Sequence, residues 1–308
     1  MMHNIHRDYT GSIHTAQLEI TPWDGEPANR DPLFINCLST EHRAENGMTY
    51  RARYNPGNSI HAWRSRYGYG SDFNQCESLT EFTDMLDDFL TAEDSKQRTK
   101  IIRLDFNVDM MDETKVAHWV KLNDLLCMTF VCKHGETKKN HMRTVTLDGG
   151  EHKSTKVVHG RMEIECYNKG IESPGLGIAY RLELRHKDMK KALNPVDVLK
   201  HWQKELRGLP QFYDEALQRW TEGLVTGWKS HDSYRNMAQY LQCNAGLLYK
   251  RSQVLEIYRR CSDSTNPDAA ADRWSNQNPD RDFISKGELI EHVNRLCQAI
   301  ESFITSCG

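Results

Sequence analysis

The stretch KIIRLDFNVDM, residues 100–110, alternates apolar and polar side chains with the period of two that is typical of a β-strand. The apolar side chains, which share one face, are Ile102, Leu104, Phe106 and Val108. The polar side chains on the other face are Arg103, Asp105, Asn107 and Asp109. This pattern predicts a sheet with one apolar face toward a core and one ionic face.

Two later stretches repeat the pattern. GRMEIECYNKG, residues 160–170, carries a polar row that consists of Arg161, Glu163, Glu165, Tyr167 and Lys169. IAYRLELRHK, residues 178–187, carries a polar row that consists of Arg181, Glu183, Arg185 and Lys187. Polar residues also alternate on an ordinary half-solvated sheet, where a cross-strand ion pair is worth only ~0.2–1 kcal/mol. An almost wholly ionic row around one central tyrosine favours a functional site.

The order of predicted elements indicates an α+β fold. A helix at 112–132 follows the first strand, and two or three strands follow within 141–169. Strand, helix, strand, strand is the order of an antiparallel ferredoxin-like or RNA-recognition-like (RRM-like) palm sheet with helices on one face. From about residue 190 the spacing becomes helical, so we predict a catalytic domain at 1–190 and an all-helical domain at 191–308.

Outside the sheet, the sequence predicts several local elements. Residues 48–70 resemble a hairpin around the turn residues 55–58, and 78–91 has helical spacing with Ser78 or Thr80 as N-cap. Residues 266–282 are polar and predict a loop. A terminal helix begins after Ser285, with Glu288 in the capping-box position.

Composition limits the classes of protein. The nine cysteines are scattered without a CxxC pair, which favours reduced thiols in a cytoplasm over disulfides or a zinc ribbon, and places Cys127 and Cys132 in a helical core. We see no signal peptide and no membrane span. The net charge of −3 shows no global signature of nucleic-acid binding, so any such function must depend on local features.

Two segments have such local features. Residues 48–70 interleave aromatic side chains with arginines, which suits contact with a nucleic-acid backbone and stacking on bases; the arginines are Arg51, Arg53, Arg64 and Arg66. Residues 232–261 have the length and turn position of a helix-turn-helix, with Lys250 and Arg251 where a recognition helix would meet DNA. The alternatives are an ordinary hairpin with a solvated cationic face for the first segment and an ordinary pair of helices, which are common at this length, for the second.

The ionic rows suit the chemistry of phosphodiesters. Clustered carboxylates bind hard divalent cations such as Mg²⁺ or Mn²⁺, which neutralise phosphate charge. A tyrosine in the same row is a candidate nucleophile, because nearby cations would lower the cost of its ionisation.

The segments RLDFNVD, ECYNKG and YRLELRHKD resemble, in this order, the catalytic domain of rolling-circle replication initiators. This is the plasmid and phage replication-initiation-factor family, which is related to the relaxases of mobile elements. The resemblance covers about residues 100–190. It implies a nick at a DNA origin, single-stranded or cruciform, in which a tyrosine becomes linked to the 5′-phosphate and a 3′-hydroxyl is freed.

The resemblance assigns roles to residues of this chain. The nucleophile falls on Tyr167, with Lys169 beside the phosphate. The acidic strand residues Asp105, Asp109 and Glu183 are expected to hold Mg²⁺ or Mn²⁺. Glu163 and Glu165 are expected to bind metal or to activate water on religation. The arginines of the polar rows, expected to contact DNA, are Arg103, Arg161, Arg181 and Arg185.

The chain departs from the family pattern in two places. It has no histidine–hydrophobic–histidine triplet, which many members use to bind metal, and Cys166 precedes the tyrosine where an aromatic residue is usual. A host helicase, a polymerase and a second copy of the chain are the other partners that the prediction includes. Two alternatives stay open: a DNA-binding replication or regulatory protein without enzymatic activity, and a metal-dependent nuclease without a covalent intermediate.

Overall fold

The structure is a computed structural model. It describes residues 8–20, 38–43, 50–68, 75–90, 99–135, 142–146, 153–230, 236–244, 251–262, 264–277 and 284–306.

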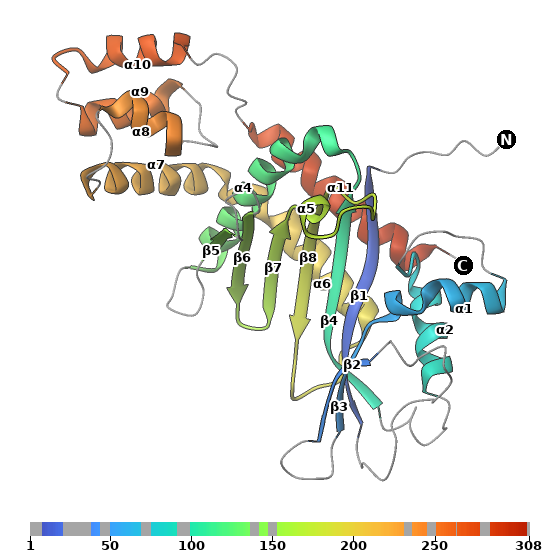
Figure 1. Cartoon of the computed structure of the whole chain (residues 1–308). Helices are drawn as coiled ribbons and strands as arrows, with labels where there is room; N and C mark the ends of the chain where they lie inside the picture. Colours follow the sequence, from blue (N-terminus) through green and yellow to red (C-terminus); the bar gives the residue numbers. More distant parts are fainter. Residues whose placement is uncertain are drawn as a thin grey trace.

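An eight-stranded antiparallel sheet forms the centre of the molecule (Figure 1). Its order is β2-β3-β1-β4-β8-β7-β6-β5. The strands are β1 (Tyr9–Ile20), β2 (Leu38–Arg43), β3 (Tyr50–Tyr54), β4 (Thr99–Met110), β5 (Met142–Thr146), β6 (Lys153–His159), β7 (Met162–Tyr167) and β8 (Tyr180–Lys187). All the strand pairs are antiparallel.

The register aligns the ionic rows of β4, β8 and β7. Asp105 of β4 lies opposite Arg185 of β8, which in turn lies opposite Glu163 of β7. Glu183 pairs with Glu165, and Arg181 pairs with Tyr167. The predicted alternation is therefore confirmed, and three strands present their polar side chains on one face.

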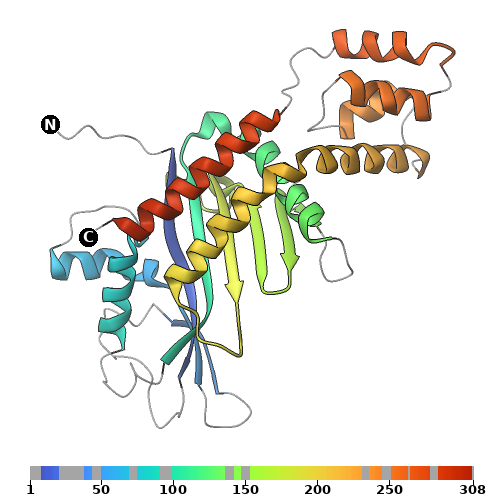
Figure 2. The same cartoon turned by 180° about the vertical axis from the view of Figure 1, so that it is seen from behind.

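The opposite face is apolar and packs against helices (Figure 2). These are α4 (Val116–His134), α6 (Pro195–Gly208) and α11 (Lys286–Thr305). Trp119, Trp202 and Phe303 are buried there, and the rings of Phe106 and Phe303 lie 5.2 Å apart. Burial of this apolar surface is the main contribution to the stability of the layers. The expected α+β fold, with helices on one face of an antiparallel sheet, is confirmed.

A helical region follows the sheet, as expected. It contains η3 (Leu209–Phe212), α7 (Tyr213–Ser230), α8 (Met237–Asn244), α9 (Arg251–Cys261) and α10 (Pro267–Gln277). Figure 1 shows α7 to α10 beside the β5 end of the sheet, whereas α11 returns to pack on β1. The boundary near residue 190 stays a prediction: the last strand ends at Lys187, but both α6 and α11 pack against the sheet.

Local capping chemistry was predicted correctly. Helix α2 (Leu79–Phe89) begins after Ser78, whose side chain accepts a hydrogen bond from the backbone of Glu81. Helix α11 begins after Ser285 with the full capping box to Glu288. These signals lie within four residues of each other, so the sequence displays them directly.

Two local predictions were wrong. After β3 the chain does not return as a second hairpin strand: it forms η1 (Pro56–Asn58) and then α1 (Ile60–Tyr67), because β3 takes β1 and β2 as its partners. The predicted loop at 266–282 contains α10, which Asn266 caps and Pro267 begins. The predicted turn of the helix-turn-helix begins at Cys243 and Asn244, which are instead the last residues of α8, and its remainder, with Lys250, lies outside the described residues.

The expected core position of two cysteines is confirmed, since Cys127 and Cys132 are buried free thiols of α4. Two shorter elements complete the description: η2 (Glu113–Lys115), before α4, and α5 (Lys169–Glu172), after β7. Among the described helices, none combines the length and the apolar character needed to cross a membrane.

Candidate active site on the polar face of the sheet

Tyr167 ends β7 on the polar face, where its hydroxyl donates a hydrogen bond to Glu183 of β8 at 2.6 Å. The side chain is almost buried, at 8% exposure. Burial, together with the charge of Glu183, raises the pKa of Tyr167 far above its ordinary value. A free phenolate is therefore strongly disfavoured, and any loss of this proton needs an acceptor such as Glu183.

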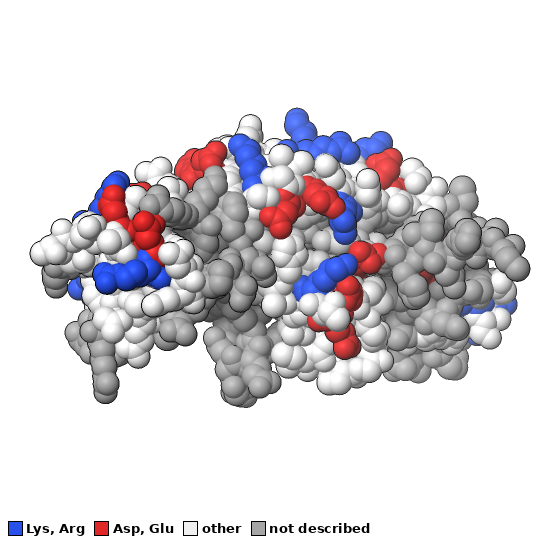
Figure 3. All heavy atoms as spheres, turned by 90° about the horizontal axis from the view of Figure 1, so that it is seen from above, with Lys and Arg blue, Asp and Glu red and all other residues white. Residues whose placement is uncertain are grey.

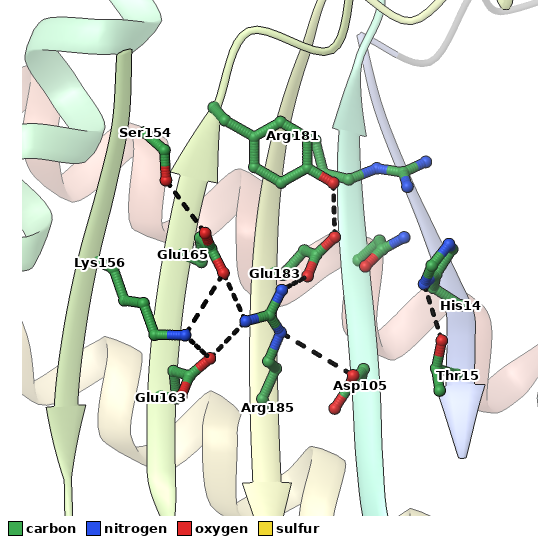
Figure 4. A network of polar contacts seen from close by, with 12 residues as sticks. His14, Thr15, Asp105, Ser154, Lys156, Glu163, Glu165, Arg181, Glu183 and Arg185 are labelled. Atoms are coloured by element: carbon green, nitrogen blue, oxygen red, sulfur yellow. Dashed lines mark hydrogen bonds and ion pairs between the residues drawn. The ribbon is translucent and has the colours of Figure 1, made fainter. Parts of the chain in front are cut away.

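Arg185 lies at the centre of the polar face, surrounded by carboxylates (Figure 4). Its guanidinium contacts Glu163, Glu165 and Glu183, and its Nε lies 3.8 Å from Asp105. Burial opposes the charge of Glu183, but the attraction of Arg185 and the hydrogen bond from Tyr167 outweigh it and lower the pKa of this carboxyl. Glu183 is therefore ionised at neutral pH.

Strand β6 adds two polar residues that the sequence reading missed. The Lys156 ammonium lies 2.6 Å from Glu163 and 3.7 Å from Glu165, and the hydroxyl of Ser154 donates to Glu165 at 3.0 Å. The available signal was that Ser154 and Lys156 alternate in the predicted strand and so share a face. In the structure, Lys156 lies opposite Glu165 in the register. Glu165, expected to act in catalysis, is thus held by Ser154, Lys156 and Arg185.

Asp109 and Arg181 form a separate ion pair. The guanidinium of Arg181 donates two hydrogen bonds to the carboxylate, at 2.6 and 2.9 Å, and both residues are buried. Burial disfavours the charged guanidinium, but Asp109 outweighs this and raises the pKa of Arg181. The side chain of Gln75 also donates to Asp109, at 3.2 Å. A DNA contact of Arg181 or a metal bond of Asp109 would require this pair to open.

The alternation predicted Lys169 in the polar row of the strand, but β7 ends at Tyr167 and Lys169 lies beyond it. Asn168 caps the four-residue helix α5, which places Lys169 in its first turn. There the ammonium pairs with Glu172 at 2.5 Å and lies 5.7 Å from the centre of the Tyr167 ring. It therefore remains close to the phenol.

His14 of β1 also lies on this face, and the sequence reading did not include it (Figure 4). The pairing of β1 with β4 shifts its register between Ile13 and Thr15, which leaves His14 in a bulge. Thr15 hydrogen-bonds its ring at 2.9 Å. Burial, reinforced by the charge of Arg181, lowers the pKa of His14 to about 4.

The carboxylates do not fit a metal site as they are arranged. The central cation is the guanidinium of Arg185, and Arg103 binds both oxygens of Asp105 at 2.7 and 2.8 Å. Among the described residues, no group of three or more His, Cys, Asp or Glu has the geometry to hold a metal ion. The expected Mg²⁺ or Mn²⁺ stays a prediction that would require the ion pairs to rearrange.

The remaining predicted DNA contacts are scattered over the molecule. Arg64 is buried and bound to Glu81 at 2.5 and 2.9 Å, so it does not face solvent. Partly exposed Arg51 pairs with Glu19 at 2.6 Å, and exposed Arg161 pairs with Asp188 at 2.5 Å.

Three more of the arginines predicted to contact DNA lie in β3, α1 and α9. Arg53 of β3 and Arg66 of α1 are exposed, and Arg251 begins α9. Figure 3 shows Lys and Arg interspersed with Asp and Glu on the face seen from above, in keeping with the small net charge. The described part of that face therefore presents no large area of one sign.

Comparison with known proteins returned one structural likeness. No protein-family model matches the chain, and no curated protein matches it in sequence. The solved structure of the rolling circle replication initiator protein from Geobacillus stearothermophilus aligns with 97% of this chain and 98% of its own, with a TM-score of 0.37 and 9% identity. This likeness assigns no role to any residue of the chain.

Proposed function

We propose that the chain is a replication initiator of the rolling-circle type, which nicks and rejoins one DNA strand through Tyr167. The observation that carries the proposal is the hydrogen bond of 2.6 Å from the Tyr167 hydroxyl to Glu183, on an ionic sheet face opposite the helical layer. A nucleophilic side chain that donates to a fixed carboxylate has the arrangement of a nucleophile and its general base. The resemblance of the three strand segments to this family supports the same reading.

The proposed step conserves atoms and charge. The Tyr167 oxygen forms a bond to phosphorus while the bond from phosphorus to the 3′-oxygen breaks, and the phenolic proton passes to Glu183. The 3′-oxygen leaves and takes a proton from water. Because the pKa of Tyr167 is raised and that of Glu183 is lowered, the proton must move as the bond to phosphorus forms.

The cations of the face have different parts in this proposal. Lys169 lies close enough to Tyr167 to attract the phosphate that the phenol attacks. Arg185 holds Glu183 in place, and a rejoining reaction would use Glu183 as the acid that returns the proton. A Mg²⁺ or Mn²⁺ ion would supply further charge stabilisation, but the present arrangement supports no step through one.

A second candidate is a DNA-binding protein without cleavage activity. It is favoured by the 8% exposure of Tyr167 and by the pairing of every predicted metal-binding carboxylate with an arginine. On this reading the polar network stabilises the sheet, and the exposed arginines, such as Arg53 and Arg66, contact DNA. A host helicase, a polymerase and a second copy of the chain remain predicted partners in either case.

A covalent-adduct assay separates the candidates. Single-stranded oligonucleotides of random sequence are labelled at the 3′ end, so that the fragment joined to tyrosine keeps the label, and the reaction is denatured before electrophoresis. We expect a labelled protein band that Tyr167→Phe abolishes. Tyr180→Phe is the matched control, because Tyr180 is buried on the apolar face and should leave the band unchanged.

Other outcomes select the other readings. Binding without a labelled band supports the non-enzymatic protein. Cleavage that survives Tyr167→Phe but is lost on Asp105→Asn selects a metal-dependent nuclease, and the reaction should then stop in EDTA. A band of equal strength from wild type and Tyr167→Phe would refute the assigned nucleophile.

A further inference from the structure

Four carboxylates from three neighbouring strands converge on one guanidinium. Asp105 comes from β4, Glu183 from β8, and Glu163 and Glu165 from β7, and each approaches Arg185. The side chain of Arg185 is only 17% exposed. The register explains the convergence, since Asp105 and Glu163 flank Arg185 directly on its two sides.

The charges of this cluster are nearly balanced without any ion. The four carboxylates are paired with Arg185, Lys156 and Arg103, which leaves a formal charge of −1. Without Arg185 the charge would be −2, which is the charge that one divalent cation neutralises. The guanidinium also contacts carboxylate oxygens of three glutamates, and a metal would need these oxygens as ligands.

We propose that Arg185 is the built-in cation of this site. Its guanidinium occupies the position between the carboxylates where a divalent metal would bind, so the wild-type chain holds Glu163, Glu165 and Glu183 in place without one. Arg185 is a positioning residue: it keeps Glu183 ionised and directed at Tyr167. This last role depends on the proposed function, whereas the exclusion of metal does not.

Electrostatics give the expected size of the effect. A unit positive charge about 4 Å from a divalent cation opposes its binding by about 8 kcal/mol at an effective dielectric constant of about 20, which corresponds to about a millionfold in affinity. Side-chain movement reduces this value. We therefore expect Arg185→Met to bind Mn²⁺ at least ~100-fold more tightly than wild type does, with one ion per chain.

The experiment measures Mn²⁺ binding directly by titration calorimetry and by the shift of the thermal unfolding midpoint. Wild type, Arg185→Met, Arg185→Lys and Lys156→Met are compared as full chains. Arg185→Lys keeps the central charge and should behave like wild type. Lys156→Met is the matched control, since it removes a cation from the same glutamates but leaves the guanidinium at the centre.

Two results would overturn the inference: tight binding of one Mn²⁺ by wild type, or no gain of binding in a folded Arg185→Met. Circular dichroism establishes whether Arg185→Met folds. If it does not fold, the wild-type titration still decides, because saturable binding between these carboxylates, lost on Glu163→Gln, refutes a built-in cation and the absence of binding supports it.

The positioning role has its own readout. If the proposed function is correct, wild type forms the DNA adduct in EDTA, Arg185→Met loses most of it, and Mn²⁺ restores it to Arg185→Met. If wild type forms no adduct under any condition, the proposed function fails, while the binding data still test the built-in cation. An adduct from wild type that requires added metal would refute the positioning role, and the binding data then decide whether the built-in cation fails with it.

Discussion

Acid is expected to weaken the attachment of α11 to the sheet through one histidine. His292 of α11 is 2% exposed, and its ring nitrogens contact the Tyr9 hydroxyl at 2.8 Å and Asn123 Oδ1 at 3.1 Å. The amide nitrogen of Asn123 donates to the Trp119 carbonyl, so its oxygen faces the histidine and accepts from Nε2–H. Nδ1 then accepts from Tyr9, and the neutral ring has both nitrogens satisfied.

The magnitude follows from the pKa of this ring. Burial lowers the pKa of His292 to about 3, and the nearby His118 and Arg295 act in the same direction. The unfolded chain has a histidine pKa of about 6.5 and therefore binds more protons than the folded chain between these values. The contribution of the neutral His292 ring to the free energy of unfolding is therefore complete above pH 6.5, and it is lost as the pH falls toward 3. At pH 5 the loss is about 2 kcal/mol.

The assay compares wild type with His292→Gln by urea unfolding at pH 7, 6 and 5, followed by tryptophan fluorescence. The glutamine does not titrate, so the difference in unfolding free energy between the two proteins should shrink by about 2 kcal/mol from pH 7 to pH 5. Other histidines with lowered pKa values, including His14, contribute equally to both proteins and cancel. A difference that stays constant within about 0.5 kcal/mol would refute the reasoning.

Three further stability predictions follow from single contacts. Asp109→Asn leaves the buried guanidinium of Arg181 without its counter-charge and should cost about 3–5 kcal/mol in chemical unfolding; a loss below about 1 kcal/mol would show that the pair is dispensable. Gly11→Ala places a Cβ 2.7 Å from a carbonyl oxygen of α11 and should cost about 1–3 kcal/mol. The control Gly223→Ala meets nothing within 4 Å in α7 and should stabilise by about 0.5–1 kcal/mol; equal effects of the two alanines would contradict the clash. Ser285→Ala removes the cap of α11 and should lower the thermal midpoint through a loss of about 1 kcal/mol, and an unchanged midpoint would count against the cap.

Local patterns in the sequence were enough to predict much of the architecture. The alternation of residues 100–110 and 160–167 showed which side chains share a face, because the direction of a side chain in a strand depends only on its position in the pleat. The caps of α2 and α11 were also evident, because their hydrogen bonds join residues that are close in the chain. The helical content of α1 was missed, since its flanking turn residues equally suit a hairpin.

What only the tertiary structure decided is which of these polar residues meet, and in what environment. The pairing of β7 with β8 brings Tyr167 to Glu183 and surrounds Arg185 with carboxylates, and a shift by one residue would have separated them. Elsewhere, Arg64 of α1 is buried beside Glu81 of α2, and the pairing of β1 with β4 adds His14 through a bulge. These outcomes depend on contacts between residues far apart in the chain, so the sequence alone determined the faces of the strands, and the fold determined the site.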